Sequence, residues 1–168
     1  MNEIQHNRDN GANGALLDEY EKSIKELKII IESVTPNELV QIVDPNTKDE
    51  DCRSIQTILT HVVRAGYNYI IEIRRSFGED VAHKDIALLD SIDEYSIALD
   101  KMFLFNENLF TDYPDIVLEE YECQKKIQVK WGQRYDVEQL FEHAIVHILR
   151  HRRQIERFIQ ILRIDLNV

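Results

Sequence analysis

The pattern that decides the fold lies in residues 137–162, which read VEQLFEHAIVHILRHRRQIERFIQIL. Apolar residues recur here alternately four and three positions apart, at Val137, Phe141, Ala144, Ile148, Ile155, Phe158 and Leu162. His151 fills the one gap in the series. This spacing is typical of the buried seam of a helix in a bundle. The sequence therefore predicts a long last helix over about 136–163, with Asp136 as its N-cap.

Two histidines share one side of this predicted helix. His151 occupies a seam position, and His147 lies one turn earlier, about 40° round the helix axis. Imidazoles four residues apart can direct their nitrogens at one metal ion. A buried seam normally takes leucine or isoleucine, so histidine there needs a reason. The competing interpretation is a pair of core histidines that are hydrogen-bonded to neighbouring groups.

Three more helices are predicted upstream. The first carries Leu17 to Val34 at helical spacing and stops at Thr35-Pro36, and the second begins after Ser54, whose hydroxyl suits an N-cap. The third covers about 85–110. The connection over 113–136 is irregular, and its alternating residues 126–131 predict a short extended segment or hairpin.

These elements predict an all-α protein with a four-helix bundle and a long irregular connection before the last helix. Residues 1–12 are expected to form a flexible tail, and residues 13–168 a single domain. Cys52 and Cys123 show no metal-binding or redox spacing and are expected to be reduced thiols.

Composition narrows the classes of function. The chain has 168 residues, of which 43% are apolar and 30% charged, and a net charge of −11. No broad basic face is evident, so nucleic-acid binding is not expected. No apolar run reaches the ~18 residues of a membrane span, and the polar N-terminus lacks a signal-peptide core, so a cytoplasmic location is expected.

Two stretches resemble signatures of the DinB/YfiT-like family of metal-binding four-helix-bundle proteins. One is SIQTILTH, from Ser54 to His61, and the other is HILRHRRQI, which begins at His147. The order of elements agrees over about 14–163. Two positions depart from the family pattern: Arg53 stands where tryptophan is frequent, and Arg153 where glycine is usual. The resemblance implies that the metal ligands are His61, His147 and His151.

The resemblance also implies a function. Three imidazoles around a divalent transition metal, zinc or nickel, leave a coordination position open for chemistry. Characterised relatives include bacillithiol- and mycothiol-dependent enzymes. The implied activity is therefore transfer of a low-molecular-weight thiol to an electrophilic small molecule, with hydrolysis by metal-bound hydroxide as the close variant. The alternative is a non-catalytic, metal-stabilised module for stress-related binding or dimerisation. A homodimer is expected in either case.

Other candidate residues have two interpretations each. His143 is predicted to lie at the surface of the bundle edge, with a role at the metal as the alternative. Cys52 precedes a helix that could lower the pKa of its thiol, yet an ordinary loop cysteine is favoured. Arg64 and Arg153 could contact an anionic substrate or simply be solvated. His83 is predicted to be a solvated loop residue.

Overall fold

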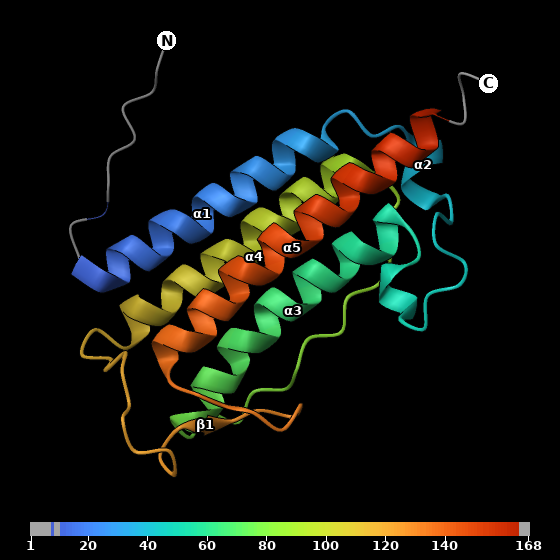
Figure 1. Cartoon of the computed structure of the whole chain (residues 1–168). Coiled ribbons are helices and arrows are strands. Elements are labelled where there is room, and N and C mark those ends of the chain that lie inside the picture. Colours follow the sequence, from blue (N-terminus) through green and yellow to red (C-terminus); the bar gives the residue numbers. More distant parts are fainter. Residues whose placement is uncertain (1–7, 9–10, 165–168) are drawn as a thin grey trace.

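The computed structural model describes residue 8 and residues 11–164 of the chain, which Figure 1 shows as four long helices lying side by side. The long helices are α1 (Gly11–Ile31), α3 (Ile55–Ser76), α4 (Ile92–Asp112) and α5 (Val137–Ile164). The connections contain α2 (Pro36–Val40), the 3-10 helix η1 (Glu50–Cys52), β1 (Ile127–Gln128) and β2 (Arg134–Tyr135). The prediction of an all-α protein is confirmed, because strand in the described residues is limited to this one hairpin.

Helix α5 is central to the packing. It contacts α1 on one side and α3 on the other, while α4 closes the arrangement by contacting α3 and α1. Every predicted seam position of α5 is buried: Val137, Phe141, Ala144, Ile148, His151, Ile155, Phe158 and Leu162. Burial of this apolar face supplies most of the driving force for packing α5, since intrinsic helix propensity contributes little.

Helix α3 begins where its sequence predicts. The Ser54 hydroxyl accepts a hydrogen bond from the Thr57 amide, and the Thr57 hydroxyl accepts one from the Ser54 amide, which completes a capping box. This fixed start sets which residues of α3 face α5. Further along, Gly66 permits close approach of α4, because a Cβ atom there would lie 1.8 Å from Sδ of Met102.

Helix α4 starts later than the predicted 85. It begins at Ile92, after a capping box between Ser91 and Glu94, and Leu88 is 54% exposed rather than part of a buried face. The preceding segment runs along α3, where the Lys84 amide donates to Asn68 and the Gln56 side chain donates to the Leu89 carbonyl. These contacts hold the segment against α3 without a helix, so the apolar spacing there was misleading.

The irregular connection before α5 contains the predicted hairpin. β1 and β2 are antiparallel, with Ile127 opposite Tyr135, and Gly132 has a φ of 89° in the turn between them. Asp136 then caps α5 by accepting a hydrogen bond from the Gln139 amide, as predicted. Both cysteines are free thiols.

At the other end of the chain, the predicted flexible tail falls largely outside the described residues, although α1 already begins at Gly11. Arg8, within the predicted tail, pairs with Asp18 of α1 and Glu107 of α4 at 2.7 Å each. Among the described residues, no helix combines the length and apolar character needed to cross a membrane.

Candidate metal centre

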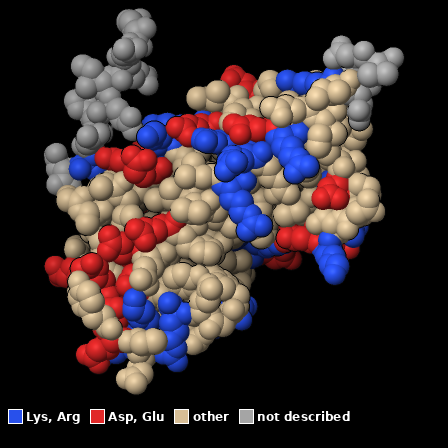
Figure 2. Space-filling view, in the orientation of Figure 1, with Lys and Arg blue, Asp and Glu red and all other residues tan. Residues whose placement is uncertain are grey.

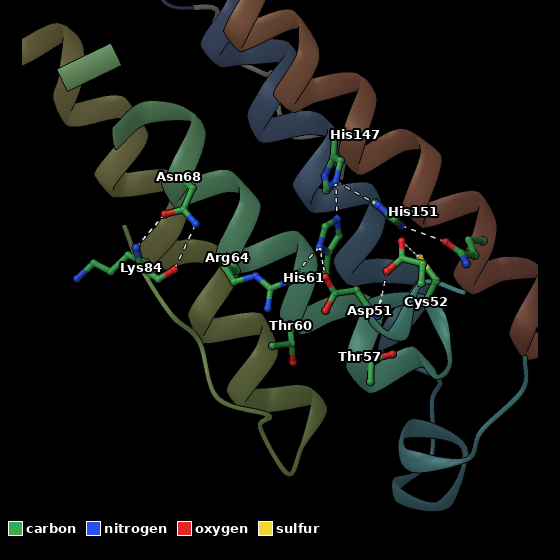
Figure 3. A network of polar contacts seen from close by, with 12 residues as sticks. Asp51, Cys52, Thr57, Thr60, His61, Arg64, Asn68, Lys84, His147 and His151 are labelled. Atoms are coloured by element: carbon green, nitrogen blue, oxygen red, sulfur yellow. Dashed lines mark hydrogen bonds and ion pairs between the residues drawn. The ribbon is translucent and has the colours of Figure 1, made fainter. Parts of the chain in front are cut away.

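Three histidine side chains meet between α3 and α5 (Figure 3). Nε2 of His147 lies 2.9 Å from Nε2 of His61 and 3.2 Å from Nε2 of His151. One ligand atom from each residue lies within 4.8 Å of the others, so the three histidines could hold a metal ion. The structure thus brings together the three residues that the sequence singled out.

Helix geometry explains this convergence. His147 and His151 are one turn apart on α5, and their rings lie 4.4 Å apart between centroids. His61 comes from the second turn of α3, and its ring centroid lies 4.8 Å from that of His147 and 5.0 Å from that of His151. His61 therefore points across the helix interface at the α5 pair, although its position lies off the most buried face of α3.

The environment of all three imidazoles lowers their pKa and so favours the neutral form. Burial, which is the main cause, and the neighbouring imidazoles together lower the pKa of His147 to about 2 and that of His151 to about 4. Burial also lowers the pKa of His61, against the opposing effect of the Asp51 carboxylate. His151 is buried, while His61 and His147 are partly exposed. Neutral imidazole is the form that binds metals.

Hydrogen bonds at the far side of two rings fix their orientation. The Asp51 carboxylate lies 3.1 Å from Nδ1 of His61, and the side-chain oxygen of Gln154 lies 3.1 Å from Nδ1 of His151. Both oxygens are acceptors, so each Nδ1 carries the proton and each Nε2 directs its lone pair toward the cluster. Such partners are typical of metal-binding histidines.

Asp51 also links the cluster to Arg64. Both His61 and Arg64 donate hydrogen bonds to the same oxygen of its carboxylate, which comes from η1 (Figure 3). Arg64 is therefore neutralised within the protein rather than simply solvated.

Arg153, the other candidate for contact with a substrate, is exposed on α5. Figure 2 shows that basic and acidic side chains are interspersed over the face of the molecule on which α5 lies.

Cys52 is not an activated thiol. It is buried in η1, with Sγ 3.4 Å from the Asp49 carboxylate. Burial raises the pKa of this thiol, as does the Asp49 charge, and these effects outweigh the opposing hydrogen bond from Gln154. The ordinary structural interpretation of Cys52 is therefore the better one.

The two remaining candidate histidines lie outside the cluster. His143 is half-buried and stacks on Trp131, at 5.9 Å between centroids and 28° between planes. The prediction that His83 is solvated was wrong: its side chain is 20% exposed, and its ring nitrogens bond to Glu72 at 2.5 Å and Lys130 at 2.8 Å. Local sequence offered no signal for either contact, because both partners of His83 are distant along the chain.

No family model, curated protein or solved structure matches the chain. The resemblance to the DinB/YfiT-like family therefore stays a prediction, carried by the two short stretches around His61 and His147.

Proposed function

We propose that this protein binds a divalent transition metal, zinc or nickel, through Nε2 of His61, His147 and His151. The observation that carries the proposal is the surplus of lone pairs over protons at the cluster. The outer hydrogen bonds of His61 and His151 leave both Nε2 atoms unprotonated, and Nε2 of His147 faces both at 2.9 and 3.2 Å. One proton on His147 can satisfy only one of these neighbours, whereas a cation satisfies all three.

The spacing supports the same proposal. Metal–imidazole bonds of roughly 2.0–2.1 Å in a tetrahedral site place the nitrogens about 3.3 Å apart. Two of the Nε2–Nε2 distances, 2.9 Å from His147 to His61 and 3.2 Å from His147 to His151, are close to this value, and one ligand atom of each of the three residues lies within 4.8 Å of the others. The donor set of neutral imidazoles suits zinc and nickel better than calcium or magnesium, which prefer oxygen ligands.

We further propose that the protein is a metalloenzyme of the DinB/YfiT-like type. Three protein ligands leave a position for a water molecule or a substrate, unlike closed structural sites with four protein ligands. The bound ion would supply Lewis-acid chemistry that activates either a small thiol for transfer to an electrophile or water for hydrolysis. The partial exposure of His61 and His147 gives small molecules access to that position.

Within this activity, the protein's own groups have distinct tasks. Asp51 and Gln154 keep the rings of His61 and His151 oriented, and His151 is itself buried. Arg64 shares the Asp51 carboxylate, which limits the negative charge near the site.

The test is elemental analysis of tag-free protein beside three variants, His61→Ala, His147→Ala and His151→Ala. About one metal ion per chain is expected in the wild type and a large loss in each variant. His83→Ala is the matched control, since it removes a histidine outside the cluster. Metal content that is unaffected by all three substitutions would overturn the proposal.

Activity is tested separately on metal-loaded protein. Consumption of an electrophile that depends on a thiol and stops with a chelator supports the transferase. Stoichiometric metal without turnover in thiol-transfer and hydrolase screens would instead support the non-catalytic, metal-stabilised module.

A further inference from the structure

Trp131, the chain's single tryptophan, lies at the tip of the hairpin and is 46% exposed. Its position is fixed rather than loose. The neighbouring Val129 is buried and exchanges backbone hydrogen bonds with Gln133 and Gly132 across the turn, and the indole N–H donates to the Gln133 side chain at 3.2 Å. A large aromatic ring is thus held at the surface, although tryptophan is highly buried on average in proteins.

Two intervening rings, Tyr69 and His143, connect Trp131 to the proposed metal centre. Trp131 stacks on His143 and meets Tyr69 edge-on at 5.8 Å, and Tyr69 meets His147 edge-on at 5.6 Å. His143 lies nearly parallel to His147, at 6.5 Å and 20°. We call Tyr69, Trp131 and His143 the aromatic wall. It brings together α3, the hairpin and α5, and it ends at a proposed metal ligand.

The aromatic rings of this wall favour some classes of ligand over others. Indole and imidazole faces attract planar π-systems, which stack on them. They also attract cations, but a divalent ion held by His147 would repel a cationic ligand at such short range. The wall therefore suits a neutral or anionic aromatic group better than an aliphatic or cationic one.

We propose that the aromatic wall binds a planar aromatic group of the substrate while a donor atom of the same molecule occupies the open metal position. This inference rests on the proposed metal site and adds the substrate class to it: an aromatic compound that is neutral or anionic. Trp131 is the specificity-determining residue, because it offers the exposed face of the wall.

Two matched probes test the proposal on the zinc-loaded protein. Benzohydroxamate and acetohydroxamate present the same metal-binding group and differ in a phenyl or a methyl substituent. Isothermal calorimetry is expected to show roughly 2- to 10-fold tighter binding of benzohydroxamate, the range expected for one added aromatic contact. Trp131→Ala should abolish that preference while acetohydroxamate binding stays unchanged, and Trp131→Phe should retain most of it.

Tyr121→Ala is the control, since Tyr121 is 85% exposed on the same connection and lies outside the wall. Equal affinities of the two probes for zinc-loaded wild type, or a preference that survives Trp131→Ala, would overturn the inference and leave the metal site intact. Binding of neither probe, or failure to retain zinc, would overturn the open metal site itself and the inference with it.

Discussion

The two ends of the three-histidine cluster differ in kind. At one end, Asp51 and Gln154 hold His61 and His151 by hydrogen bonds, so ring direction is specified there. At the other end, His147 contacts Tyr69 and His143 through ring faces and edges. Such contacts fix how the rings pack, but they do not determine which nitrogen of His147 carries the proton. The polar end therefore orients histidine rings as ligands for a metal. The aromatic end offers ring surfaces to a molecule bound at that metal.

The largest expected effect comes from removing the metal itself. A ligand that binds only the folded state stabilises it by about 4 kcal/mol when its concentration is 1,000 times its Kd. Removal of bound zinc or nickel with a chelator should therefore lower the free energy of unfolding by about this amount. Thermal unfolding followed by circular dichroism, with and without chelator, measures it. An unchanged Tm would contradict a metal site in the fold.

The next largest effect is expected from His147→Ala, since His147 is both a proposed metal ligand and the histidine that contacts the rings of the aromatic end. Its loss removes a direct ligand, so the metal affinity should fall by more than the roughly 100-fold upper limit typical of outer partners. Competition with a chromophoric chelator measures the change. His83→Ala should bind metal as the wild type does, and a comparable loss in that variant would point to general misfolding.

An intermediate effect is expected at the polar end alone. Asp51→Asn keeps the shape but removes the charge that supports His61, and the metal affinity should fall roughly 10- to 100-fold. Glu50→Gln is the matched control: it removes the same charge from η1, yet Glu50 is largely exposed and pairs with Arg53 rather than with a histidine. Equal affinities in the two variants would mean that Asp51 does not support the site.

The smallest effect on metal affinity is expected at the aromatic end. Trp131→Ala should leave it within about 2-fold, because the indole contacts no ligand atom. Loss of the ring contacts should cost about 1 kcal/mol of stability, or a Tm decrease of ~2–4 °C. The same chelator competition and thermal scans measure both. A large loss of metal affinity would show that the two ends are not separable.

Part of the polar end could be read from the sequence, because some of its contacts are local. The His147–His151 spacing, the seam of α5 and the Ser54 cap each follow from residues a few positions apart, and Gln154 lies one turn beyond His151. The start of α4 was also readable, since Ser91 and Glu94 form a capping-box pattern that the apolar spacing around Leu88 obscured.

The rest depends on contacts between distant segments. Nothing in the local sequence places Asp51 beside His61, or Trp131 on His143, because the η1 turn and the hairpin must first dock on the bundle. His61 itself lies off the most buried face of α3, and only the family resemblance suggested it as a ligand. Long-range packing decided these positions, which periodicity along a single helix does not encode.

The placement of the only tryptophan gives the protein an intrinsic fluorescent reporter. Emission excited selectively at the indole arises from Trp131 alone, whose ring stacks on His143 one helical turn from His147. Paramagnetic nickel or cobalt at the three histidines would quench this emission, whereas zinc would not. Metal exchange and the arrival of an aromatic molecule can therefore be followed in real time without any attached label.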